Sequence, residues 1–260
     1  MRTHLENTGK KLITLVSYMG GASILLGKTL LWLPVPPIKR KPIFGQLYKI
    51  GVQSLPIVSL ISLFTGMVLA LQSAYQMQRL SAEMYIASLV SLSMTRELGP
   101  VLTALIVAGR VGAAITAEIG TMKVTEQIDA LETLATNPVR YLIVPRFIAL
   151  VLMLPLLTIY SDMIGIIGGY IIGTYKLHIA HNMYMKMTYE PLVLKDLVTG
   201  LLKALTFGII ICTVSCFEGM RTEGGAEGVG KATTLSVVIS FIMIIAADCL
   251  ITALFYFAFR

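Results

Sequence analysis

Five long apolar runs constrain the fold of this chain more than any other feature. They cover about 51–76, 84–111, 141–174, 193–217 and 233–258, and a helix needs roughly 20 such residues to cross a bilayer. Hydrocarbon leaves backbone polar groups no outside partner, so runs of this kind fold as helices there. Only 13% of the 260 residues are charged, about half the share of a typical soluble domain. The sequence therefore predicts an all-α, polytopic integral membrane protein with five transmembrane helices.

The N-terminal segment, residues 1–44, has a different character. It is rich in Lys and Arg, and "LPVPPIKRKP" ends its helical pattern because clustered prolines cannot continue a helix. A basic amphipathic helix typically lies in the membrane interface. We therefore expect an interfacial helix in 1–44 and one membrane domain in 45–260. The apolar stripe of the interfacial helix consists of Leu12, Leu15, Val16, Met19, Ala22 and Leu26.

The distribution of basic residues predicts the orientation. The net charge is +7, and eight of the 21 Lys and Arg residues precede position 51. With the N-terminus inside, cytosolic segments hold 14 of them and external segments five. Cytoplasmic flanks of spanning helices collect Lys and Arg, so we expect a cytoplasmic N-terminus and an external C-terminus. This membrane-surface explanation accounts for the positive charge better than nucleic-acid binding does.

Four charged residues lie well inside the predicted spans: Arg96, Glu97, Lys203 and Asp248. Helical rise places Arg96 and Asp248 about 18 Å, and Lys203 about 15 Å, from the same side of the membrane. Two cations and two anions at one level would offset part of their desolvation cost. Such residues normally face a bundle interior or a wet cavity. Asp162 lies nearer the external end of its span.

Two interpretations of this charged group remain open. It is either a purely structural network or a polar pocket that a zwitterionic or anionic ligand joins. We favour the pocket, because one ion pair would suffice for assembly and a buried ion pair is weak evidence for stability.

The segment "EIGTMKVTEQIDALETLATNPVR" joins the second and third spans on the predicted cytosolic side. Its pattern predicts an amphipathic helix at about 122–135 that ends before Pro138. This helix either rests on the membrane surface or docks a cytosolic partner; we favour docking, since a mainly acidic face suits a basic protein groove better than an anionic bilayer. The apolar stripe is Val124, Ile128, Leu131 and Ala135, and the polar face is Lys123, Glu126, Gln127, Asp129 and Glu132.

Two smaller motifs carry less weight. "GAEGVGK", residues 225–231, matches part of a phosphate-binding loop, but no strand precedes it and Ala232 replaces the required Ser or Thr. Any ATP hydrolysis would therefore fall to a separate subunit. "GIIGGYIIG" places Gly165, Gly169 and Gly173 on one face for close helix packing, within the bundle or at a dimer seam.

The cysteines and histidines do not predict a metal site. Cys212, Cys216 and Cys249 all fall in apolar runs, which indicates packing rather than a disulfide framework. His178 and His181 are expected to be solvated in the external loop, because no third type of ligand lies near them.

Three blocks of the sequence closely resemble the MlaE (YrbE) family of ABC-transporter permeases: "GQLYKIGVQSLPIVSLISLFTGMVLALQ", "RELGPVLTALIVAGRVGAAITAEIGTMKVTEQIDALETLATNPVRYLIVPR" and "GGAEGVGKATTLSVV". The similarity covers about 45–258. The resemblance implies a homodimeric permease of the bacterial inner membrane with a periplasmic C-terminus. It also implies two cytosolic ATPase subunits that bind ATP and Mg²⁺, and a periplasmic ring of MCE domains. The complex would move phospholipid or a related lipid and support the lipid asymmetry of the outer membrane.

The resemblance also assigns roles to residues. It places Arg96 and Glu97 of the "RELGP" motif, with Lys203, near a lipid cavity, and it makes "TEQIDALE" the segment that contacts the ATPase. The chain itself would need no cofactor and would not be an enzyme. Further lining residues would come from the outer part of the first span: Leu69, Gln72, Gln76 and Met77.

Two other functions compete with this one. An ion- or proton-coupled secondary transporter would use Glu97, Asp162 and Asp248 as a relay, but such folds often show internal repeats and none is found here. A membrane anchor for an MCE complex would not transport anything itself. Dependence on an ATPase partner would separate both from a permease.

Overall fold

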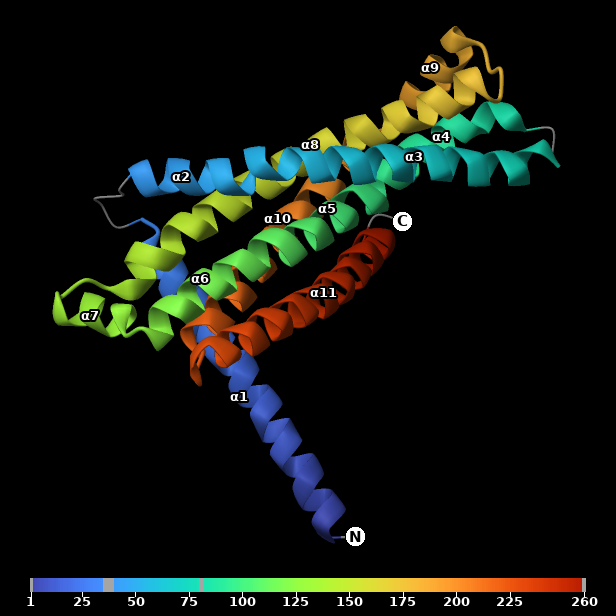
Figure 1. The fold of residues 1–260 in the computed structure, drawn as a ribbon. Coiled ribbons are helices and arrows are strands. Elements are labelled where there is room, and N and C mark those ends of the chain that lie inside the picture. Colours follow the sequence, from blue (N-terminus) through green and yellow to red (C-terminus); the bar gives the residue numbers. More distant parts are fainter. Residues whose placement is uncertain (1, 35–39, 80–81, 259–260) are drawn as a thin grey trace.

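The computed structural model describes residues 2–34, 40–79 and 82–258, the side chains of 2–12, 14, 15 and 258 excepted (Figure 1). Within these residues all regular structure is helical, as predicted. The five candidate spans are Arg40–Gln78, Glu83–Val124, Val139–Tyr175, Leu194–Met220 and Gly225–Phe257. The helices are α1 (Arg2–Trp32), α2 (Arg40–Ile50), α3 (Leu55–Gln78), α4 (Ile86–Ser93), α5 (Gly99–Val107), α6 (Ala113–Val124), α7 (Gln127–Thr133), α8 (Val144–Tyr175), α9 (His181–Tyr189), α10 (Leu194–Met220) and α11 (Gly225–Ala258).

Helix α8 is the centre of the bundle. It packs against α3 on one side and against α10 on the other, and α10 then packs against α6 and α11. The main apolar core lies between these helices and includes Leu150, Leu154, Phe207 and Ile211. α7 and α9 lie at opposite ends of the bundle (Figure 1), in keeping with the prediction that their loops lie on opposite sides of the membrane.

The second span is longer than predicted and is interrupted by two π-helical turns. The prediction ended it near 111, but α6 continues to Val124. The π turns are Met94–Leu98 and Ala108–Gly112, and each contains an arginine. π turns occur frequently at functional sites, and the first one carries the "RE" of the "RELGP" motif.

The predicted cytosolic helix at 122–135 is in fact two segments. Lys123 belongs to α6, the chain breaks at Glu126 with a positive φ of 59°, and α7 covers only Gln127–Thr133. A second positive φ, 54° at Ala135, ends the helical region before Pro138 is reached. Ile128 is buried and Leu131 packs against the main core, so the apolar face of α7 contacts protein rather than the membrane surface.

Helix α1 contacts the bundle partly through residues outside the predicted stripe. Tyr18 packs edge-to-face on Phe217 of α10, with ring centroids 5.1 Å apart. Val16 and Met19 of the predicted stripe are exposed, whereas Leu26 packs against the main core. The side chains of Leu12 and Leu15 and residues 35–39 lie outside the described residues.

The remaining motifs have clear positions. Residues 225–231 form the first turns of α11, which is a geometry unlike that of a phosphate-binding loop. The glycine stripe lies within the bundle: Gly165 faces Met94, and Gly169 and Gly173 face Tyr184 of α9. The loop that was predicted to be external thus contains a helix, α9, that the sequence did not predict. His181 begins that helix, and its Nδ1 lies 2.7 Å from Tyr170 Oη.

Candidate functional site

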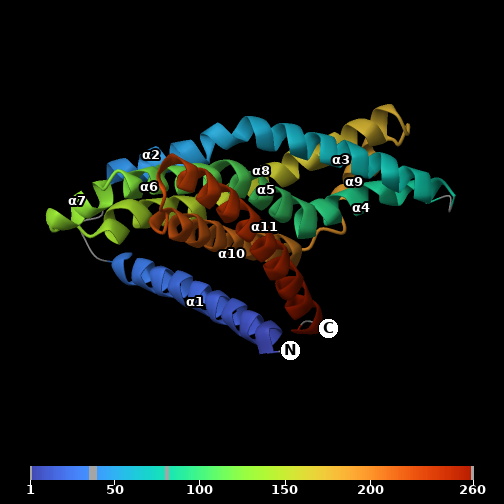
Figure 2. The same cartoon turned by 60° about the horizontal axis from the view of Figure 1, so that its bottom comes forward.

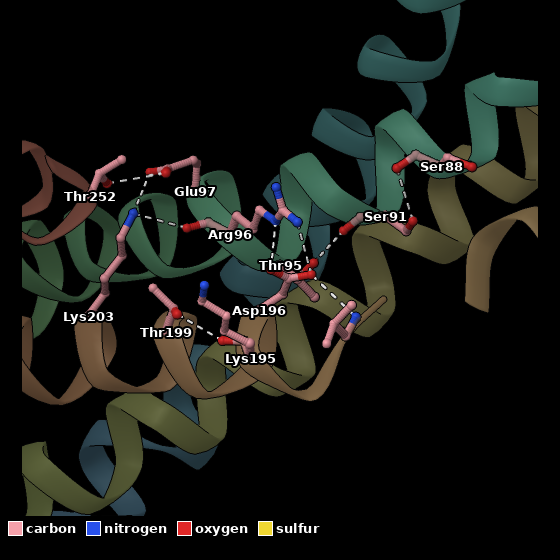
Figure 3. Close-up of polar contacts among 11 residues, drawn as sticks. Ser88, Ser91, Thr95, Arg96, Glu97, Lys195, Asp196, Thr199, Lys203 and Thr252 are labelled. Carbon is pink, nitrogen blue, oxygen red and sulfur yellow. Dashed lines mark hydrogen bonds and ion pairs between the residues drawn. The ribbon is translucent and has the colours of Figure 1, made fainter. Parts of the chain in front are cut away.

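Lys203 is the centre of a cluster of charges inside the membrane domain (Figure 3). Its Nζ lies 2.5 Å from Glu97 Oε2 and 2.8 Å from Asp248 Oδ1, and it donates a 3.0 Å hydrogen bond to the carbonyl oxygen of Arg96. Thr252 donates to the other oxygen of Glu97 at 3.2 Å. The Lys203 side chain is only 1% exposed. Three helical segments therefore meet through one buried ammonium group.

Arg96 points to a different partner. It forms a two-pronged contact with Asp196, with Nε 2.8 Å from Oδ1 and Nη2 3.1 Å from Oδ2. Asp196 also accepts a 3.3 Å hydrogen bond from the amide of Val193 at the start of α10. This fork is the geometry with which arginine binds carboxylates and phosphates. The predicted group of four is thus a set of three centred on Lys203, beside a separate Arg96–Asp196 pair.

The local sequence explains how Lys203 reaches the backbone of Arg96. Pro100 has no N–H, so it cannot bond to the carbonyl four residues earlier, which is that of Arg96. Lys203 fills this vacancy. α10 comes this close because Gly200 has no side chain: a Cβ there would lie 2.5 Å from the carbonyl oxygen of Thr95.

The site is open on one side. The side chains of Arg96 and Glu97 are 50% and 43% exposed, against 22% for Asp248. α11 forms the edge of this opening, because none of its described residues beyond Ile244 is buried, and in Figure 2 its C-terminal half runs away from the bundle. Fixed positive and negative charges therefore face an open side, where a ligand that carries both signs would find partners.

The four lining residues proposed on the first span lie elsewhere in the single chain. Leu69 and Met77 pack against an apolar cluster of α3 and α4 residues that includes Ala70, Ala74 and Val90. Gln72 and Gln76 are exposed on α3. No ion pair or hydrogen bond within the described residues joins any of the four to Lys203.

The polar residues of the predicted cytosolic segment lie at the surface. Glu126, Gln127, Asp129 and Glu132 are all exposed. Lys123 does not add a free positive charge, because its Nζ lies 2.9 Å from Asp129 Oδ1 and ties α6 to α7. α7 therefore offers an acidic surface on a segment whose other face is anchored in the core.

A shallow hollow of about 430 Å³ lies along the N-terminal half of α11, and its lining includes none of the charged residues of the Lys203 cluster. It is lined by Gly230, Lys231, Thr234, Leu235 and Val238. Within the described residues, no group of three or more His, Cys, Asp and Glu side chains gathers as metal ligands.

Comparison with known proteins decides the family. The model of the family described as Permease MlaE matches residues 43–254, which is most of the chain. The chain belongs to the MlaE permease family. It is therefore a multi-pass membrane protein of the ABC-transporter permease class, and the five apolar helices agree with this assignment.

Individual relatives in this family span bacteria and a plant. A probable ABC transporter permease of Rickettsia typhi is 52% identical over 221 residues, which cover 85% of each chain. The intermembrane phospholipid transport system permease protein MlaE of Haemophilus influenzae is 38% identical and aligned over 95% of both chains. The chloroplastic protein TRIGALACTOSYLDIACYLGLYCEROL 1 of Arabidopsis thaliana is 37% identical over 90% of this chain and 67% of its own.

The sequence analysis missed two residues of the site, Thr252 and Asp196. A signal was present, because Asp196 precedes Lys203 by seven residues and two helical turns place both on one face of α10. Its position at the end of a span hid its role, since a carboxylate there resembles an ordinary helix-capping residue.

Proposed function

We propose that this chain is the permease subunit of an ABC transporter that moves phospholipid or a related lipid between the inner membrane and a periplasmic MCE protein. The observation that carries the proposal is the half-exposed charged site within an apolar wall. Charges at this depth are costly unless they face a polar cavity or a partner. A lipid headgroup carries the charges that Arg96, Glu97 and Lys203 complement, while its acyl chains suit the surrounding apolar helices. The family relative named for intermembrane phospholipid transport supports the same cargo.

In this proposal the open side is closed by a second copy of the chain. The weakly packed outer half of α11 would line a chamber between two subunits, with the site of each copy facing inward. Leu69, Gln72, Gln76 and Met77 would border the lipid path only in this assembly, beyond the charges.

Energy would come from two separate ATPase subunits, which bind ATP and Mg²⁺. The acidic face of α7, with Leu131 anchoring it in the core, is the proposed docking element on the cytoplasmic side. ATP binding would bring the two copies together, reduce the chamber and move the lipid towards the periplasmic side, where the C-terminus is expected.

Native mass spectrometry of the purified complex, together with lipid transfer from proteoliposomes to the MCE acceptor, tests the proposal. We expect two permease copies, two ATPase copies and retained lipid, with ATP-dependent transfer that Glu97→Lys reduces at least tenfold. Glu83→Lys, a charge reversal outside the site, is the matched control. Transfer that persists in a complex with an inactive ATPase would favour the membrane-anchor or ion-coupled alternatives and contradict the proposal.

A further inference from the structure

Asp162 is a buried acid that the proposed lipid site does not use. It lies in the C-terminal half of α8 and is 6% exposed. Its Oδ1 has no hydrogen-bond partner, and neither oxygen takes part in an ion pair or hydrogen bond within the described residues. By contrast, each of the three carboxylates of the lipid site has a cationic partner. Asp162 therefore stands in a different environment from Glu97, Asp196 and Asp248.

The Asp162 carboxyl group contacts Gly99, the glycine of the "RELGP" motif. A Cβ on Gly99 would overlap both Oδ1 and Cγ of Asp162, so the carboxyl group lies directly against the backbone of α5. One turn further along α8, Gly165 packs on Met94 in the same way. The acid thus fills the seam between α8 and the start of α5, immediately after the π turn that carries Arg96 and Glu97.

The two nearest hydroxyl groups on α8 are already occupied. Ser161, the preceding residue, shares a 2.7 Å hydrogen bond with Ser62 of α3. Thr158, one turn earlier, donates to the carbonyl of Leu154. Neither hydroxyl therefore compensates the Asp162 carboxyl.

The charged and titratable groups on the helices that pack against α8 do not pair with Asp162. α4 and α5 contain none, and the charges of the π turn between them go to α10. On the remaining elements packed against α8, these groups are engaged with other partners, lie at the exposed surface or lie towards the ends of the bundle. They are Tyr18 and Lys28 among the described side chains of α1, Arg40, Lys41, Tyr48 and Lys49 on α2, Tyr75 on α3, Arg140 and Tyr141 on the π turn Val139–Ile143, Arg146, Tyr160, Tyr170 and Tyr175 on α8, His181, Tyr184, Lys186 and Tyr189 on α9, and Lys195, Asp196, Lys203, Cys212, Cys216 and Glu218 on α10.

We propose that Asp162 is a proton-binding site of the permease, occupied while α8 and α5 are packed as they are here. An isolated carboxylate without a cation or donor is far more costly to bury than the neutral acid, so the group keeps its proton. If α5 separates from α8 and water enters the seam, the acid ionises and releases the proton. The proton is then a second ligand, which favours the packed arrangement just as any ligand favours the state that binds it.

This proton site fixes the direction in which pH shifts the equilibrium between the packed and the separated arrangement of α5 and α8. The packed state binds one proton more than a state in which Asp162 is hydrated, so raising the pH disfavours the packed state. The equilibrium constant for leaving it rises up to tenfold per pH unit, while the hydrated acid is ionised and the packed acid is not. Asp162→Asn, which mimics the neutral acid, removes this dependence.

Infrared spectroscopy of the purified protein in lipid nanodiscs tests protonation without any transport assay. At neutral pH, exposed carboxyl groups are ionised, since their pKa is about 4. We expect a carboxylic-acid C=O band that Asp162→Asn deletes and that the matched variant Asp248→Asn leaves in place. Identical wild-type and Asp162→Asn spectra in this region would overturn the proposal, whatever the cargo of the permease.

A second measurement uses the unmodified chain, in case Asp162→Asn fails to fold. Dicyclohexylcarbodiimide, an apolar reagent, reacts with protonated carboxyl groups in apolar surroundings, and peptide mass spectrometry locates the adduct. We expect modification at Asp162 at neutral pH and several-fold less at alkaline pH, with Asp196 unmodified as the ion-paired reference. Labelling of Asp196 but not of Asp162 would contradict the assignment.

Discussion

At the scale of single residues, the ion pairs around Lys203 lower the cost of placing charged side chains within the membrane. One ammonium group serves two carboxylates and one backbone carbonyl. Removing one member of such a group is far more damaging than the net contribution of the group to stability suggests, because the remaining charges lose their partner.

Replacing Lys203 with methionine tests this balance. Glu97 and Asp248 would then face each other without a cation, and we expect a loss of about 3–5 kcal/mol of stability together with loss of lipid transfer. Thermal unfolding in detergent and transfer from proteoliposomes are the measurements. Lys203→Arg keeps the charge and should retain the greater part of both; equal damage from the two variants would show that shape rather than charge matters there.

The sequence predicted which charged residues gather at the site better than it predicted how they pair. Helical rise placed Arg96, Glu97, Lys203 and Asp248 at one level, and the side chains of Glu97 and Asp248 do meet at Lys203. Helical rise gives depth but not direction, so it did not reveal that Arg96 turns away to Asp196. The π turn contributes to this difference, because an extra residue in one turn rotates all later side chains, and apolar runs carry no signal for it.

At the scale of helices, the contact of α1 with the bundle depends on small residues. A Cβ on Gly21 would lie 2.7 Å from Phe217 Cζ, whereas a Cβ on its neighbour Gly20 meets nothing within 4 Å. The amphipathic pattern predicted the helix and an apolar stripe for the membrane interface, but it did not predict which residues would contact the bundle. An interfacial helix has two apolar environments, lipid and protein, and hydrophobicity does not distinguish them.

The adjacent glycines offer a matched pair for α1. Gly21→Leu should push the helix off Phe217 and lower the stability by about 1–3 kcal/mol, the usual cost of overpacking. Gly20→Leu should leave it within about 0.5 kcal/mol, as surface changes normally do. Thermal unfolding and protease sensitivity of the N-terminal segment report both effects. Equal shifts for the two variants would argue that α1 is not held by this contact.

The acidic face of α7 makes a second prediction at this scale. Reversing Glu126, Asp129 and Glu132 to lysine should abolish co-purification of the ATPase, because like charges would then face a basic groove. Glu227→Lys, a reversal on the exposed first turns of α11, is the control and should keep the ATPase bound. A triple variant that co-purifies with normal ATPase turnover would show that α7 is not the docking element.

At the scale of the whole molecule, the open side of the charged site requires a cover. Exposed apolar side chains, such as Leu60, Phe64 and Val68 on α3, can face acyl chains without cost. Glu97 and Arg96 cannot, since ionic groups in contact with acyl chains are strongly disfavoured. A copy of the same chain supplies both a wall and a second set of charges, and twofold symmetry is the commonest arrangement of homo-oligomers.

Cross-linking through α11 tests this arrangement. Cys249 is the exposed one of the three cysteines, and Ile245 one turn earlier is 58% exposed. In a Cys249→Ser background, Ile245→Cys should give a covalent dimer with a short bifunctional maleimide in native membranes. Leu60→Cys on α3, equally exposed at 58%, should not. Because both positions lie on apolar surfaces within the membrane domain, reagent access is matched and only the location of the second copy differs. Cross-linking at Leu60 alone would place the partner against α3, and the charged site would then need a cover other than α11 of a second copy.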